Sequence, residues 1–245
     1  MSTRIEDIRP EQETAARWED YIDVLFSPVA LFQRRANDRL LPPMLTLGIA
    51  TAVVALLMIP VNSRAISAST AGNPQAAEFM EQYGLLFNIL GALFAPAFII
   101  VLVLWAAVLL WGATSALSID VSFRQTVLIA TYAGFLYLVA QILGGVLTMV
   151  SGPEFDLVRD TSFGVLRFTG AEGIPPVVVP LVRRIDLFAI WQAVLWAIGI
   201  GVIGRVSYAK AGLAAAIAFI VYAAPGMLLA SLGLGQGPPP TTVTT

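Results

Sequence analysis

The feature that most constrains this chain is a run of uncharged, mostly apolar residues from 85 to 117. About 20 such residues suffice for an α-helix to cross the hydrocarbon core of a bilayer. Similar runs recur along the sequence, and only 12% of the 245 residues are charged. Soluble domains carry about 25% charged residues. We therefore predict an all-α polytopic membrane protein.

The apolar runs predict about five transmembrane helices. Their expected bounds are residues 44–61, 85–117, 123–150, 186–206 and 211–234. We interpret the second run as one tilted helix kinked at Pro96, because no loop residues would separate two spans there. Ser122 and Gln125 have the spacing of a capping box at the start of the third. Asp186 is a suitable N-cap for the fourth.

The spans divide the chain into three parts. Residues 1–43 are expected to form a cytoplasmic amphipathic segment, residues 44–234 the transmembrane domain, and residues 235–245 a disordered tail. Glycine, proline and mixed charge break the hydrophobic pattern at residues 151–184, which predicts the largest extramembrane loop. Residues 62–84 are predicted to form a shorter polar loop.

Basic residues near the span ends indicate the orientation, because cytoplasmic loops retain lysine and arginine. With an inside N-terminus, most of these residues fall on the cytoplasmic side: Arg34, Arg35, Arg39, Arg124, Arg205 and Lys210. Only Arg64, Arg183 and Arg184 flank spans on the other side. We therefore expect a multi-pass protein of the cytoplasmic (inner) membrane, with its N-terminus inside and its C-terminus outside.

The composition excludes several kinds of chemistry. The chain contains no cysteine and no histidine, which removes thiol nucleophiles, imidazole acid–base catalysis and the commonest zinc ligands. Its acidic residues lie mostly in the termini and predicted loops, so paired catalytic carboxylates are not expected. The net charge of −2 argues against a nucleic-acid partner, which requires a clustered cationic surface. We expect no enzyme activity, no cofactor and no metal.

An amphipathic helix is predicted just after the charged N-terminus. Its apolar residues recur at i, i+3, i+4, i+7 and i+8: Trp18, Tyr21, Ile22, Leu25 and Phe26. The acidic residues Asp20 and Asp23 fall on the opposite side of the helix. These five apolar residues are the first part of a candidate partner surface.

A second amphipathic helix follows, with Ser27 as its N-cap and Pro28 as its first residue. Phe32 lies on its apolar side, and it adds three basic residues to the candidate surface: Arg34, Arg35 and Arg39. Two interpretations fit this periodicity equally. The helices lie along the cytoplasmic headgroups, where the arginines attract anionic lipid, or they pack against the cytoplasmic end of the bundle.

Two further sets of residues lie within the predicted spans. Small residues repeat at every fourth position of the fourth span, which lets helix backbones approach closely: Ala189, Ala193, Ala197 and Gly201. This contact is either intramolecular or a homodimer seam, so a homo-oligomer is possible. The most polar side chains within spans are Asn88, Gln141 and Gln192. They either form interhelical hydrogen bonds or line a transport path.

Several short motifs recur along the chain in a recognisable order: DVLFSP at residues 23–28 leading to Phe32, SFRQ at 122–125, Tyr132 with Ala133, and DLFAIW at 186–191 followed by Gly199. In these motifs the chain resembles the Yip-one domain family, whose eukaryotic members interact with Rab and Ypt GTPases. The resemblance implies a cytoplasmic N-terminus, about five spans and a non-catalytic role in membrane organisation or protein recruitment. The alanine-rich, lysine-poor composition indicates a bacterial member, for which no role in GTPase recruitment is carried over.

The function predicted from the sequence is therefore that of a non-catalytic membrane scaffold or organiser. It is expected to recruit lipid or unknown protein partners through the N-terminal amphipathic segment. The alternative is a transporter or translocator of small solutes or lipids. The two are distinguished by whether the polar residues of the spans share a wet cavity or fill dry helix contacts.

Overall fold

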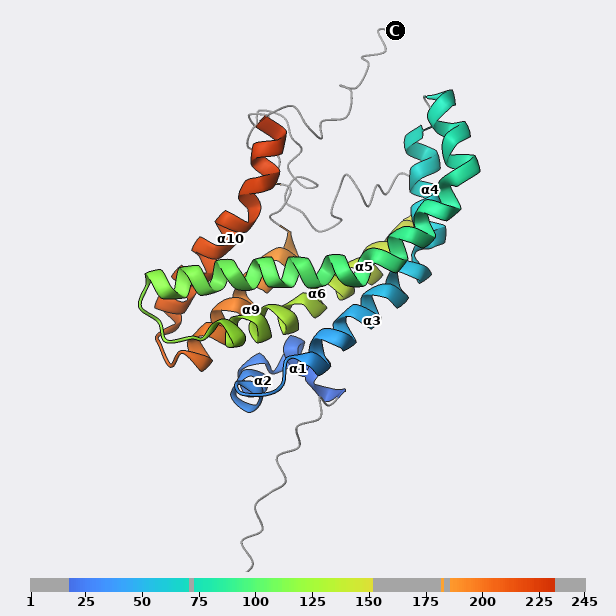
Figure 1. Ribbon diagram of the computed structural model, residues 1–245. Coiled ribbons are helices and arrows are strands. Elements are labelled where there is room, and N and C mark those ends of the chain that lie inside the picture. The colour runs from blue at the N-terminus through green and yellow to red at the C-terminus, as the bar shows by residue number, and fades with distance from the viewer. Residues whose placement is uncertain (1–17, 71–72, 152–181, 183–185, 232–245) are drawn as a thin grey trace, which may run out of the picture.

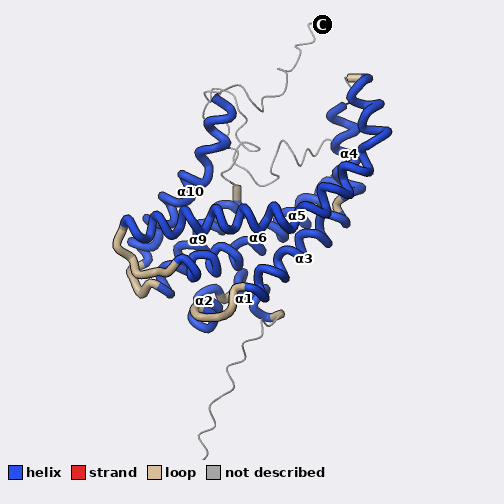
Figure 2. The backbone as a smooth tube through the Cα atoms, viewed as in Figure 1, coloured by secondary structure: helices blue, strands red, loops and turns tan. Residues whose placement is uncertain are grey.

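The computed structural model describes residues 18–70, 73–151, 182 and 186–231. These residues form helices joined by short turns (Figures 1 and 2), which confirms the all-α class for the described part of the chain. The helices are α1 (Glu19–Phe26), α2 (Pro28–Arg35), α3 (Leu41–Leu57), α4 (Ile59–Thr70), α5 (Pro74–Ala116), α6 (Phe123–Ser151), α9 (Leu187–Ile203) and α10 (Tyr208–Ser231). The predicted loop at 151–184 lies almost entirely outside the described residues, and the predicted tail at 235–245 lies wholly outside them.

The second predicted span is a single helix, as expected. α5 has 43 residues and contains Pro96 in its interior, and Figure 1 shows it changing direction part-way along its length. A proline bends a helix because it removes one backbone hydrogen bond and its ring crowds the preceding turn. α5 begins at Pro74 rather than at residue 85. Asn73 caps it by accepting a hydrogen bond from the amide of Ala76 at 3.2 Å.

The prediction of a polar loop at residues 62–84 is wrong, because most of these residues are helical. α4 continues to Thr70 and α5 starts at Pro74. An asparagine N-cap followed by proline at the first helical position is a strong helix start. The two helices pack together, and Asn88 Nδ2 donates a hydrogen bond to Ser63 Oγ at 3.1 Å. The polar character of residues 62–84 therefore did not mean that they form a loop.

Two other predicted helix starts are confirmed by their side-chain hydrogen bonds. The amide of Ser122 donates to Gln125 Oε1 at 2.9 Å, and the amide of Gln125 donates to Ser122 Oγ at 3.3 Å. This reciprocal pair is a capping box at the start of α6. The amide of Ala189 donates to Asp186 Oδ1 at 2.7 Å, which caps α9.

α6 is the central helix of the bundle. It packs against α3, α5 and α9, and its residues 126–136 are all buried. Within the described residues, α5 and the part of α6 from Phe123 to Leu147 are long and apolar enough to cross a bilayer. α3, α9 and residues 208–222 of α10 are shorter apolar helices.

Candidate functional site

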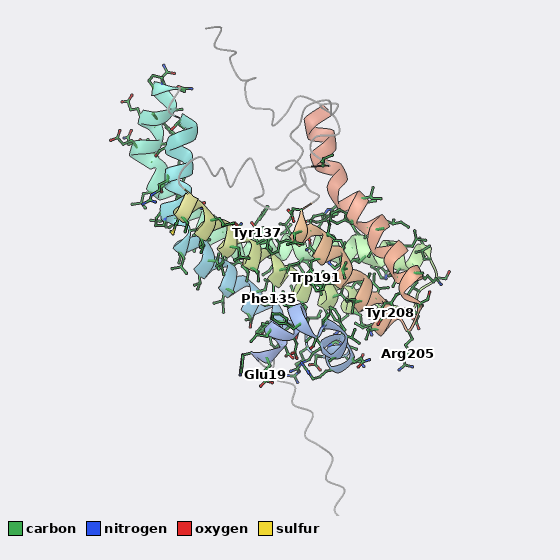
Figure 3. The ribbon with its side chains drawn as sticks, turned by 180° about the vertical axis from the view of Figure 1, so that it is seen from behind. Glu19, Phe135, Tyr137, Trp191, Arg205 and Tyr208 are labelled. Carbon is green, nitrogen blue, oxygen red and sulfur yellow. The ribbon has the colours of Figure 1, made fainter. Side chains whose placement is uncertain are left out.

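The N-terminal helix pair, which consists of α1 and α2, is docked on the side of the bundle. α1 packs against α6, and α2 packs against α9. Figure 3 shows the pair in blue along one side of the bundle, with Glu19 at its outer edge. Val24, Leu31 and Phe32 are fully buried in the hydrophobic core. The pair is therefore an integral part of the folded bundle.

Aromatic rings make the contact between the pair and α6. The ring centroid of Tyr21 lies 4.5 Å from that of Phe135 and 6.5 Å from that of Tyr132. Phe32 of α2 meets the same Tyr132 edge-on at 6.4 Å. Tilted and edge-to-face geometries of this kind stabilise aromatic pairs beyond the area that they bury. Both helices of the pair are thus held by one region of α6.

The turn between α1 and α2 is formed by the backbone. The amide of Ser27 donates to the carbonyl of Asp23 at 2.7 Å, which ends α1, and the carbonyl of Ser27 accepts from Leu31 at 3.1 Å, which starts α2. Ser27 occupies the predicted N-cap position, but its side chain makes no capping hydrogen bond. Pro28 occupies the first helical position as predicted. The two helices therefore fold back on each other without a loop.

A buried ion-pair network lies inside the pair. Asp20 and Arg35 have side chains that are 0% and 3% exposed. Asp20 Oδ1 accepts from Arg34 at 2.6 Å, and its Oδ2 lies 2.8 Å from Arg35 Nη2. Arg34 also donates to Asp23 at 2.6 Å, and Arg35 donates to Asp38 at 2.5 Å. The name ion-pair network refers below to these five residues.

The sequence placed Asp20 on the polar side of the predicted helix and did not indicate that it is buried. A buried carboxylate is stable only when cations and hydrogen bonds replace its water, and two arginines of α2 do so here. Three acidic residues in α1 followed by two adjacent arginines in α2 are the signal that could have indicated this network. Helical periodicity could not, because it treats every charge as solvent-facing.

The arginines of the network are held in their charged form. Hydrogen bonds to Asp23 and then Asp20 raise the pKa of Arg34. Burial by itself lowers the pKa of Arg35, but hydrogen bonds to Asp38 and Asp20 outweigh it and leave that pKa raised. Two of the three basic residues of the candidate partner surface are thus paired within the chain. Arg39, the third basic residue of that surface, is exposed.

The connection between α2 and α3 is fastened to α6. Arg124, in the first turn of α6, donates hydrogen bonds to the carbonyl oxygens of Asn37, at 3.2 Å, and of Asp38. Arginine suits this position because its planar fork reaches two acceptors at once. Arg124 therefore also holds the α2–α3 connection against the start of α6.

The outer face of α1 is apolar and uncovered. Trp18, Ile22 and Phe26 are 69%, 47% and 80% exposed, and they follow one another at i, i+4 and i+8 on one side of the helix. We call these three residues the outer ridge. Tyr21 and Leu25, predicted on the same face, pack against the core instead. The structure thus divides the predicted apolar face into a docking side and an exposed side.

The three polar residues of the predicted spans lie in separate places. Asn88 is bonded to Ser63 in the α4–α5 hairpin, and Gln141 Nε2 donates to the hydroxyl of Tyr137, one turn earlier in the same helix. Gln192 is half-buried on α9. A polar cavity of about 780 Å³ lies between α2, the α5–α6 turn and the end of α9, and none of the three lines it.

The small residues of α9 differ in what they face. A Cβ built on Gly201 would lie 3.1 Å from the Tyr208 ring and 3.5 Å from Ala211 Cβ, so this glycine faces the start of α10. Ala189, Ala193 and Ala197 are half-buried. The tightest approach on α9 is at Gly199, where a Cβ would lie 2.8 Å from Ile129 Cγ1 of α6. The fourfold spacing of the stripe did not single out Gly199.

Comparison with known proteins identifies the family. A family model described as the Yip1 domain matches residues 22–230, which include most of the N-terminal helix pair and the whole described bundle. The chain belongs to the Yip1 domain family. This confirms the resemblance seen in the sequence. No curated protein and no solved structure matches the chain.

Membership of the Yip1 domain family agrees with the physical character of the helices. The family is one of membrane proteins, and α5 and α6 are long and apolar enough to cross a bilayer. This Yip1 domain protein is therefore a helical membrane protein. Among its described residues there is no group of three acidic, cysteine or histidine side chains that could hold a metal ion.

Proposed function

We propose that this Yip1 domain protein is a non-catalytic scaffold that organises the membrane and engages its partners through the N-terminal helix pair. The observation that carries the proposal is the two-sided character of α1. On its inner side Asp20 pairs with two arginines of α2 and Tyr21 packs against α6, while the outer ridge is exposed. A rigidly held apolar surface supports a binding role, because little conformational entropy is lost when it is covered.

The transport alternative has less support in the structure. A path across the bundle would bring polar side chains together around water. Asn88 and Gln141 instead lie apart, and each bonds to a side chain near it, Ser63 and Tyr137 respectively. The polar cavity lies at one end of the bundle, where it is lined by α2, by the turns and by the ends of α6 and α9, and it does not run along the spans.

The proposal includes five spans, formed by α3, α5, α6, α9 and α10, with the N-terminus in the cytoplasm. The α5–α6 and α9–α10 turns lie at the same end of the bundle (Figure 1), and residues of both line the polar cavity. The basic residues Arg124, Arg205 and Lys210 lie in or beside these turns, as expected for a cytoplasmic side.

Single-cysteine labelling tests this topology, because the natural chain contains no cysteine. Gln75→Cys lies in the first turn of α5 and Ala209→Cys in the first turn of α10, and both positions are exposed. We expect an impermeant maleimide to label Gln75→Cys in intact cells and Ala209→Cys only after permeabilisation. Labelling of both variants in intact cells would contradict the five-span arrangement.

The partner surface is tested by replacing Trp18, Ile22 and Phe26 with serine. Because these side chains are exposed, we expect membrane insertion and thermal stability in detergent to stay close to wild type. We expect the lipids and proteins that co-purify in native nanodiscs to be depleted, since each apolar side chain contributes at most about 1.5–3 kcal/mol when fully buried. Mass spectrometry of the purified particles measures this.

The matched control for the serine variant is Gln33→Ser, at an exposed polar position of α2. It should leave the co-purifying set unchanged. If the ridge variant folds and inserts but retains the same lipids and proteins as wild type, the helix pair is only structural and the recruitment proposal is wrong.

A further inference from the structure

The residues of α6 that contact α1 lie some way along that helix from its first residue, Phe123. α6 has 29 residues, so its length is about 43 Å at 1.5 Å per residue. Tyr132 and Phe135, which contact Tyr21, follow Phe123 by about 14 and 18 Å along the helix axis. Figures 1 and 3 agree that the pair lies alongside the bundle and not beyond the α5–α6 and α9–α10 turns.

This distance places the pair at the level of the membrane. The hydrocarbon core is about 30 Å thick, so a helix of about 43 Å that spans it projects by at most about 13 Å at its first end. Tyr132 is therefore at the hydrocarbon boundary or below it, and Phe135 is a few ångströms deeper. Tilting α6 shortens its projection and leaves this order unchanged. Tyr21, stacked on Phe135, shares that depth.

The ion-pair network fits this depth. Charged groups near hydrocarbon are costly unless they are paired, and Asp20 and Arg35 are both buried and paired. Arg34 bridges Asp20 and Asp23 on the edge of α1.

We propose that α1 is embedded in the leaflet on the side of the α5–α6 and α9–α10 turns, so that the partner of the outer ridge is membrane lipid. This rests on the proposed function, in which α6 spans the membrane. The ridge is apolar and begins with a tryptophan, a residue that favours the headgroup level. Amphipathic helices at an interface bury their apolar face about 5–10 Å into the boundary between headgroups and acyl chains. α3, which follows the pair, also exposes apolar residues along one side, at Leu41, Leu45 and Ile49.

Tryptophan quenching tests the proposal on the intact chain in nanodiscs. The chain has five tryptophans, so the Trp18 signal is taken as the difference between wild type and Trp18→Phe. We expect phosphatidylcholine brominated on its acyl chains to remove most of the Trp18 signal, and aqueous iodide to remove little of it. A matched control is Gln33→Trp in the Trp18→Phe background, on the side of α2 that lines the polar cavity, where iodide should quench and bromolipid should not.

Quenching of Trp18 by iodide and not by bromolipid would overturn the inference, because the ridge would then face water. If Trp18→Phe proves unstable, Ile22→Trp compared with wild type gives the same measurement one helical turn further along the ridge. A failure here is distinct from a failure of the scaffold proposal. A water-facing ridge whose serine variant still loses co-purifying proteins would identify a protein partner instead.

Discussion

Replacing Asp20 by asparagine is expected to destabilise the protein by about 3–5 kcal/mol, the usual cost of removing one partner from a buried ion pair. The carboxylate of Asp20 is completely buried and lies 2.6 Å from Arg34 and 2.8 Å from Arg35. Asparagine keeps the size of the side chain but leaves the Arg35 cation, which is 3% exposed, with less compensation in a region poor in water.

The expected structural result is separation of α1 from α2, which loosens the N-terminal helix pair on α6 and α9. It is measured as a lower melting temperature in detergent, together with faster proteolysis at residues 36–40, which connect α2 to α3. The matched control is Asp23→Asn. Asp23 is 29% exposed and pairs with Arg34, which is 41% exposed. Loss of this partly exposed ion pair should cost no more than about 1 kcal/mol of stability.

A double variant tests whether charge or shape matters at this place. Asp20→Leu with Arg35→Met removes both buried charges, and apolar replacements of a buried pair are often neutral or stabilising. We expect it to recover most of the stability lost in Asp20→Asn. Equal melting temperatures for Asp20→Asn, Asp23→Asn and wild type would show that the network does not hold α1 to α2.

Replacing Gly199 by leucine is expected to separate α6 from α9 and to destabilise the protein by about 1–3 kcal/mol or more, the range found for overpacked cores. A Cβ at this position would already lie 2.8 and 2.9 Å from Ile129 Cγ1 and Cγ2. Ile129 is fully buried, and a β-branched side chain in a helix has one strongly preferred rotamer, so it cannot move aside.

The control for Gly199→Leu is Gly212→Leu, because no atom lies within 4 Å of a Cβ built on Gly212. That variant should melt close to wild type. Adding Ile129→Ala to Gly199→Leu should restore part of the lost stability, since the leucine then fills the space that isoleucine leaves. Additive losses in the double variant would show that the two residues are not in contact.

The sequence alone determined the elements that depend on local patterns. Long uncharged runs predicted α5 and α6, and the short motifs at Ser122 and Asp186 predicted two helix starts that the structure confirms. The family was also evident from the sequence and is confirmed by the match to residues 22–230. These features depend on backbone hydrogen bonding at helix ends and on the thickness of the bilayer, which sets how many apolar residues a span needs. Both are therefore visible in short stretches of sequence.

Only the tertiary structure decided which faces are covered. Helical periodicity placed Tyr21 and Trp18 on one apolar side and Asp20 on the polar side, but α6 covers the side that carries Tyr21 and Asp20 and leaves Trp18 outside. Spans are apolar all round, so their sequence does not mark the contacting side, and only the structure shows that Gly199 faces Ile129. The physical reason is that burial depends on residues far apart in the chain, such as Asp20 and Arg35, whose pairing no local pattern contains.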